Sequence, residues 1–312
     1  MKKYAFGVDI GGTTCKIGFF DTNGTLLDKW EIKTNTENNG ESILSDVAKA
    51  VDNKLAQEAI SKDDVQGIGI GVPGPVDSQG VVHRCVNLGW GVVNVAEELG
   101  NLTGLKIKVG NDANVAALGE MWQGGAKGSK DVIMVTLGTG VGGGIIVDGK
   151  VVAGFTGAGG EIGHITVNND EIEACNCGQY GCLEQYTSAT GIVRLAKRKL
   201  AKSTEETSIR EIPNLTAKDV FDAAKAGDAI AIGLVDEVCE ILGSTLSNIA
   251  CVVNPEIIVI GGGVSKAGDI LLDNIKKHFV ETSFMACRET KFALAGLGND
   301  AGMYGCVEML LD

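Results

Sequence analysis

The chain opens with three short apolar runs separated by polar turns that contain glycine. The runs cover residues 4–10, 17–20 and 25–32, and the turns lie at 11–14 and 21–24. Apolar runs of this length, bounded by glycine, asparagine and aspartate, are typical of β-strands joined by tight turns. The pattern therefore predicts a three-stranded antiparallel meander at the start of the protein.

A helix and further strands follow the predicted meander. Residues 41–60 carry apolar side chains at the spacing of one helix face, and residues 65–72 form a buried run that ends at Pro73-Gly74-Pro75. A short run at 105–109 leads into a helix expected at about 113–122. A meander followed by alternating helices and strands indicates an α/β protein with a mixed sheet.

The opening pattern then returns. Residues 132–137 are apolar, 138–144 form a glycine turn, 145–147 are apolar again, and a turn at 148–149 leads to a short run at 151–152. This repetition indicates an internal duplication of one structural unit, and two such units predict two lobes with a cleft between them.

We expect the lobe boundary near residues 123–129. Residues 1–122 then form a small N-terminal lobe, joined by a C-terminal helix at 300–312, and residues 123–299 form a large lobe. The remaining elements expected are helices at about 187–201, 217–226, 229–252 and 301–311, and a strand at 257–260 that runs into Gly261-Gly262-Gly263.

Composition excludes several classes of protein. Hydrophobic residues make up 44% of the 312, charged residues 21%, and only 4 are proline, so disordered, collagen-like and coiled-coil chains are excluded. The net charge of −13 disfavours nucleic acid and anionic lipid as partners. The N-terminal stretch contains no signal-peptide core, and no run of 18 apolar residues occurs. We therefore expect a cytoplasmic protein without a membrane span.

Two stretches match the dinucleotide-binding pattern GxGxxG by letter, at 69–74 and 138–143. Both fail on context, because the first contains Pro73 and the second runs into another strand instead of a helix. Residues 144–150 have Walker-type spacing, but Val151 stands where a magnesium-binding hydroxyl is needed.

The two glycine-threonine turns suit phosphate binding instead. Backbone N–H groups of glycines can converge on phosphate oxygens, and neighbouring threonine hydroxyls add donors. Asp9, at the end of the first strand, is a suitable carboxylate for Mg²⁺. The alternative is that these turns are ordinary hairpin turns; their duplication favours phosphate binding. The predicted phosphate and magnesium residues are Asp9, Gly11, Gly12, Thr13, Gly138, Thr139 and Gly140.

Three of the nine cysteines are crowded near a histidine. The spacing is His164-x10-Cys175-x-Cys177-x4-Cys182. Three thiolates and one imidazole form the closed tetrahedral set of a structural zinc site. Free thiols are one alternative, and a nucleic-acid-binding zinc knuckle is another, but no Lys or Arg lies between residues 165 and 186. Zinc at this site would clamp the loop that carries Glu161 and Glu184.

Asn111 and Asp112 lie at the start of the helix at 113–122. Either residue suits helix capping. Asp112 also suits the role of proton acceptor in phosphoryl transfer, because an Asp kept ionised by a helix N-terminus can accept a proton from an attacking hydroxyl.

Five motifs in this order resemble the ROK family of sugar kinases, and within it the bacterial glucokinases. They are Asp9-Ile10-Gly11-Gly12-Thr13, Gly110-Asn111-Asp112-Ala113-Asn114, residues 137–144, Glu161-Ile162-Gly163-His164, and the cysteine segment 175–184. The resemblance implies the actin-like ATPase (ribonuclease H-like) fold with ATP in the interlobe cleft. Many members have Lys after Gly-Gly-Thr, whereas this chain has Thr14.

The resemblance also implies roles for single residues. Asp112 is expected to be the catalytic base, and His164 to contact both zinc and sugar. The glycines after the strand at 257–260 are expected near the adenosine part of ATP. The residues expected at the sugar are Gly74, Asn87, Asn111, Asp112, Glu161, His164 and Glu184; those expected at adenosine are Gly261, Gly262 and Gly263.

The implied activity is phosphorylation of the 6-hydroxyl of glucose with MgATP, in a homo-oligomer that is a dimer or tetramer. Alternatives are another ROK hexose kinase, acting on N-acetylmannosamine, fructose or mannose, and a non-catalytic sugar-binding regulator. A repressor of the same family needs a DNA-binding helix-turn-helix, and the first phosphate turn begins too early in this chain to leave room for one.

Overall fold

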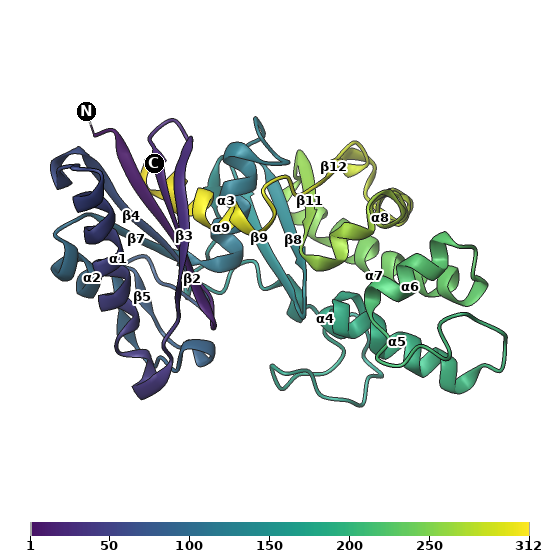
Figure 1. The fold of residues 1–312 in the computed structure, drawn as a ribbon. Helices are drawn as coiled ribbons and strands as arrows, with labels where there is room; N and C mark the ends of the chain where they lie inside the picture. Colours follow the sequence, from purple (N-terminus) through teal and green to yellow (C-terminus); the bar gives the residue numbers. More distant parts are fainter. Residues whose placement is uncertain (1, 312) are drawn as a thin grey trace.

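The computed structural model describes residues 2–311 and contains two five-stranded sheets of identical topology (Figure 1). The strand orders are β3-β2-β1-β4-β7 and β10-β9-β8-β11-β12. In each sheet, the first three strands along the chain form an antiparallel meander. The two later strands run parallel to the first strand of that meander. The predicted meanders, their duplication and the α/β class are confirmed.

The first sheet consists of β1 (Tyr4–Ile10), β2 (Thr14–Asp21), β3 (Leu26–Lys33), β4 (Val65–Val72) and β7 (Ile107–Asn111). The second consists of β8 (Val132–Leu137), β9 (Val141–Val147), β10 (Lys150–Val151), β11 (Ile257–Gly261) and β12 (Lys291–Leu294). A small separate sheet pairs β5 (Val81–Val82) with β6 (Val93–Asn94).

The α-helices are α1 (Ile43–Gln57), α2 (Val95–Thr103), α3 (Asp112–Gln123), α4 (Glu184–Thr187), α5 (Ala189–Lys202), α6 (Ala217–Lys225), α7 (Ala229–Val253), α8 (Asp269–Thr282) and α9 (Ala301–Leu311). The short 3₁₀ helices are η1 (Glu37–Gly40), η2 (Lys62–Asp64), η3 (Val86–Leu88), η4 (Ile162–His164), η5 (Gly263–Ala267), η6 (Met285–Cys287) and η7 (Gly298–Asp300).

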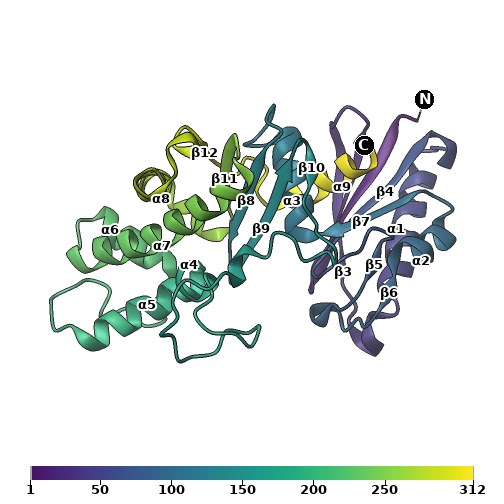
Figure 2. The same cartoon turned by 180° about the vertical axis from the view of Figure 1, so that it is seen from behind.

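Helices α3 and α9 lie between the two sheets, as the front and back views both show (Figure 1, Figure 2). Helix α9 packs on β1 and β4 of the first sheet, and α3 packs on β8 and β9 of the second. Strand alternation explains this layering. Phe6 and Val8 of β1 pack with side chains of α1 and α2 on the outer face of the first sheet. Ala5 of β1 packs with Met303 and Val307 of α9 on the inner face.

Glycines allow this central layer to pack closely. A Cβ atom added at Gly69 of β4 would lie 1.7 Å from the carbonyl oxygen of Cys306 in α9. One added at Gly305 of α9 would lie 1.6 Å from the carbonyl oxygen of Val115 in α3. Backbone therefore meets backbone at both contacts, which accounts for part of the unusual content of 45 glycines.

Some elements are not among those predicted from the sequence. These are α2, α8, β12 and the small β5-β6 sheet. Strand β12 has only four residues, too few to show alternation, and it pairs in parallel with β11. Among the described residues, no helix is long and apolar enough to cross a membrane.

Candidate active site

Residues from both halves of the molecule line one cavity of about 470 Å³. Its wall combines the β1–β2 pair, the start of α3, the turn between β8 and β9, and the start of α9. The sequence-predicted residues that line it are Asp9, Asp112, Gly138, Gly140, Glu184 and Gly262. Residues distant in sequence thus meet at one place, where the two sheets face each other across α3 and α9.

Asp9 and Lys16 lie opposite each other on β1 and β2. Their backbones are in register, and Lys16 Nζ lies 3.9 Å from Asp9 Oδ2. Burial raises the pKa of Asp9, and the Lys16 charge opposes that change. Among the described residues that line the cavity, Lys16 is the only basic side chain. It is not among the predicted site residues, although strand alternation puts residues 14 and 16 on one face of β2.

Asp112 is the first residue of α3, and Asn111 caps that helix. The Asn111 side-chain oxygen accepts hydrogen bonds from the N–H groups of Ala113 and Asn114, at 3.0 and 3.2 Å. The Asp112 carboxylate accepts one further bond from the Ala113 N–H, at 2.8 Å. Capping therefore falls to Asn111, and Asp112 is left facing the cavity.

The pKa of Asp112 is raised to about 6. Desolvation by the surrounding cleft is the main cause, and the negative charges of Asp9 and Glu161 add to it. The Ala113 hydrogen bond lowers the pKa, but by less. Desolvation and the two neighbouring carboxylates thus outweigh the hydrogen bond at the helix N-terminus, and the role of Asp112 as proton acceptor stays a prediction.

Two of the predicted sugar-binding residues, Gly74 and Asn111, are hydrogen-bonded to each other, and a third, Asn87, packs against the first phosphate turn. The Asn111 side-chain amide donates a hydrogen bond to the Gly74 carbonyl oxygen at 3.2 Å. Gly74 has φ of +133°, in the region that favours glycine. Asn87 lies on η3, and a Cβ atom added at Gly12 would lie 3.4 Å from the Asn87 carbonyl oxygen. The first phosphate turn thus packs against the Asn87 segment.

Glu184 connects the second glycine turn with the cysteine segment. Its Oε2 accepts a hydrogen bond from the Val141 N–H at 3.4 Å, and its Oε1 accepts one from the Cys175 thiol at 2.9 Å. A Cβ atom added at Gly140 would lie only 2.5 Å from Glu184 Oε2. A side chain at position 140 would therefore displace the Glu184 carboxylate from its present position at the turn.

His164, Cys175, Cys177 and Cys182 come together as predicted. Their ligand atoms all lie within 4.8 Å of one another. The Sγ atoms of Cys177 and Cys182 are 3.6 Å apart, and His164 Nδ1 lies 4.0 Å from Cys175 Sγ. Ligands of a tetrahedral zinc ion are roughly 3.5–3.8 Å apart, given metal–ligand bonds of about 2.1–2.3 Å. This group is therefore compatible with zinc.

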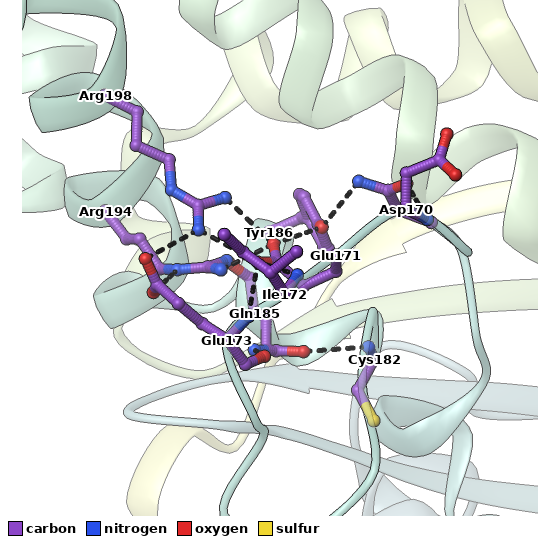
Figure 3. Close-up of polar contacts among 10 residues, drawn as sticks. Asp170, Glu171, Ile172, Glu173, Cys182, Gln185, Tyr186, Arg194 and Arg198 are labelled. Atoms are coloured by element: carbon purple, nitrogen blue, oxygen red, sulfur yellow. Dashed lines mark hydrogen bonds and ion pairs between the residues drawn. The ribbon is translucent and has the colours of Figure 1, made fainter.

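A buried carboxylate anchors the cysteine segment to α5 (Figure 3). Glu171 accepts hydrogen bonds from both terminal nitrogens of Arg198, at 2.8 and 2.9 Å, and from the Tyr186 hydroxyl at 2.6 Å. These bonds, with Arg198 foremost, hold the pKa of Glu171 well below its usual range. The Gln185 side-chain oxygen accepts a further hydrogen bond from the Cys182 N–H at 3.0 Å. The segment is therefore held at two points besides the cysteine cluster.

Gly262 and Gly263, which follow β11, line two different cavities. Gly262 lines the 470 Å³ cavity, and Gly263 lines a neighbouring pocket of about 260 Å³ with Phe221 and Val264. Gly261 is buried, and a Cβ atom added there would lie 2.6 Å from the Met134 side chain. Contact of Gly261 with a ligand stays a prediction.

Part of each predicted phosphate turn lies outside the main cavity. Gly11, Gly12 and Thr13 are not among its lining residues, although Asp9 and Lys16 beside them are. Thr139 lines an adjoining pocket of about 340 Å³, which also contains Glu184 and Arg194. The phosphate contacts of Gly11, Gly12, Thr13 and Thr139 stay predictions.

Comparison with known proteins gives a consistent result. The sequence model of the ROK family matches residues 5–312. A glucokinase of Halalkalibacterium halodurans is 46% identical over 97% of this chain and 93% of its own length. A glucokinase of Thermotoga maritima is 35% identical over 97% of this chain and 96% of its own. The crystal structure of a ROK family glucokinase from Streptomyces griseus, in complex with glucose and AMPPNP, is 33% identical, covers 98% of each chain and has a TM-score of 0.76.

Proposed function

This chain belongs to the ROK family, and we propose that it is a glucokinase that transfers the γ-phosphate of ATP to the 6-hydroxyl of glucose. Its two duplicated sheets form the actin-like ATPase fold of ROK sugar kinases. The observation that carries the proposal is the shared cavity, in which Asp112 lies with Asp9, Lys16 and the glycine turn after β8. The similarity to two glucokinases over nearly the whole chain supports it.

The phosphates of ATP are proposed to lie between Lys16 and the turn at Gly138 and Gly140. Lys16 supplies the positive charge that a cavity with three carboxylates otherwise lacks. Asp9 offers a carboxylate oxygen, the ligand type that Mg²⁺ prefers. Bound there, Mg²⁺ would neutralise charge on the transferring phosphoryl group. The apolar pocket behind Gly263 suits the adenine ring.

Asp112 is proposed to accept the proton of the attacking 6-hydroxyl. Phosphoryl transfer requires a positioned acceptor more than a strong base. A pKa of about 6 leaves Asp112 mostly ionised at neutral pH, while making it a better proton acceptor than an ordinary aspartate. The rigid start of α3, capped by Asn111, fixes the position of this carboxylate.

The sugar is proposed to bind between the two halves, against Gly74, Asn87, Asn111, Asp112, Glu161, His164 and Glu184. Carboxylates, amides and imidazole are suitable partners for sugar hydroxyls. Support comes from three links: the hydrogen bond from Asn111 to Gly74, the electrostatic coupling of Glu161 to Asp112, and the contact of Glu184 with Gly140.

We further propose that His164, Cys175, Cys177 and Cys182 hold a structural zinc ion. The donor set is closed, and the separations fit tetrahedral coordination. Zinc would crosslink the segment without taking part in the reaction. Because Glu184 follows Cys182 by only two residues, fixing the cysteines would also hold the segment that carries this sugar-binding carboxylate.

The test is sugar-dependent ADP release with MgATP, measured for glucose, mannose, fructose, N-acetylglucosamine and N-acetylmannosamine at equal concentrations. A dominant response to glucose is expected. A larger response to another sugar would replace glucose as substrate and leave the kinase mechanism in place. No ADP release with any sugar would contradict the proposed kinase and favour a sugar-binding regulator.

A further inference from the structure

Glu120 is a fully buried acidic residue that the proposed reaction does not use. It lies near the end of α3, two turns after Asp112, and its exposed fraction is 0%. Acidic side chains are almost never fully buried unless they have partners. Its surroundings therefore need an explanation.

The carboxylate of Glu120 accepts three backbone hydrogen bonds. Oε2 accepts from the Gly125 N–H at 2.7 Å and from the Gly296 N–H at 2.8 Å, and Oε1 accepts from the Leu297 N–H at 2.9 Å. All three partners are donors, so the site suits a carboxylate, which only accepts. Hydrogen bonds to an ionised acceptor are stronger than those between neutral groups.

These partners belong to two segments, the interlobe crossings, by which the chain passes between the sheets. Residues 124–131 lead from α3 to β8, and residues 295–300 lead from β12 to α9. The segments also touch each other, because a Cβ atom added at Gly296 would lie 3.4 Å from the Gly125 nitrogen. A change in the angle between the halves would therefore involve both crossings.

Both crossings lead directly to the cavity. The second continues into Asn299 and Gly302, which line the cavity wall, and the first continues through β8 to Gly138. On the other side, α3 rigidly joins Glu120 to Asp112 over about 12 Å, at 1.5 Å per residue. Glu120 therefore ties the helix that carries Asp112 to both segments that lead to the cavity.

We infer that Glu120 is a positioning residue for phosphoryl transfer, which clamps the two interlobe crossings and so aligns the phosphate-binding turn with Asp112. This inference rests on the proposed kinase reaction for its kinetic consequence. The clamp itself is a property of the backbone and can be measured without substrate.

The decisive variant is Glu120→Gln, which keeps the side-chain size. An amide can accept at only one end, so at least one crossing N–H loses its acceptor and faces another donor. Gly125→Ala is a second variant, which keeps Glu120 and pushes the crossings apart, because the new Cβ would lie 2.6 Å from the carbonyl oxygen of Leu294, where the second crossing begins. Glu98→Gln, on the exposed face of α2, removes the same charge and serves as the control.

Amide hydrogen exchange followed by mass spectrometry should show about tenfold faster exchange at residues 124–126 and 296–297 in Glu120→Gln, with unchanged exchange in the strands. Its kcat for glucose should fall about tenfold, while both KM values change less than about threefold. Gly125→Ala should change both quantities in the same direction, and Glu98→Gln neither.

If the crossings in Glu120→Gln exchange their amide hydrogens at the wild-type rate, Glu120 does not clamp them. Faster exchange with wild-type kcat, or a loss of kcat matched by loss of folded protein, would overturn the positioning role. Absence of glucose phosphorylation in the wild-type protein would instead overturn the proposed function, and the exchange comparison would still decide whether the clamp exists.

Discussion

Replacing Asp112 by Asn should inactivate the enzyme and, above about pH 6, make the folded protein more stable. The carboxyl has a pKa of about 6 in the folded protein against 3.8 for an unperturbed aspartate. This difference corresponds to about 3 kcal/mol by which folding disfavours the ionised form. Asp112 borders an open cavity in which water screens charges, so we expect about half of this, roughly 1.5 kcal/mol.

The pH dependence has a defined sign. Because the folded pKa is raised, the favourable contribution of Asp112 is complete below about pH 4 and is lost as the pH rises through about 6. Asn does not titrate, and its side-chain oxygen can still accept the hydrogen bond from Ala113. The stability of Asp112→Asn relative to wild type should therefore increase between about pH 4 and pH 6.5 and level off above that.

Urea denaturation of both proteins across this pH range, without sugar or nucleotide, measures the difference. Asp77→Asn is the control, because hydrogen bonds from Val81 and Gln79 lower the pKa of Asp77; the stability of that variant relative to wild type should fall only as the pH rises towards about 4 and stay constant above that. A difference for Asp112→Asn that is constant or falls with pH would refute desolvation as the cause of the raised pKa. A kcat near wild type would remove Asp112 from the role of base.

Three further predictions concern the same cavity and the cysteine segment. The kcat/KM of the wild-type enzyme for glucose should fall about fivefold between pH 6 and pH 5 as Asp112 becomes protonated, and a pH–rate profile without a limb near 6 would contradict this. Lys16→Met should raise the KM for MgATP about tenfold or more while glucose binding, measured by calorimetry, changes little; an unchanged KM would place the phosphates elsewhere. Cys177→Ser, or treatment with a zinc chelator, should weaken glucose affinity more than ATP affinity, and metal analysis that finds no zinc in the pure protein would contradict the proposed crosslink.

Local patterns allowed much of the fold to be predicted from the sequence. Both meanders, the helix after Asn111 and the closing helix depend on strand alternation, glycine turns and caps, which are local in sequence. The convergence of His164 with three cysteines was predictable from metal-ligand spacing alone. These features need no knowledge of distant contacts.

Features that depend on distant contacts could not be predicted in this way. Lys16 acquires its role from the register between β1 and β2, and Glu120 from a crossing 176 residues away in sequence. The raised pKa of Asp112 depends first on desolvation by the cleft and then on Asp9 and Glu161, all of which come from segments distant in sequence. The lobe boundaries, the homo-oligomer and the cytoplasmic location stay predictions.

The position of α9 has a consequence for biosynthesis. This helix supplies most of the side chains that cover the inner face of the first sheet around Ala5 and Phe20, yet it is translated after every strand of both sheets. A nascent chain that has completed β7 therefore exposes an uncovered apolar face until residues 301–311 leave the ribosome. Ribosome-bound or truncated chains should consequently depend on chaperones, and the N-terminal half should complete its folding last, although it is made first.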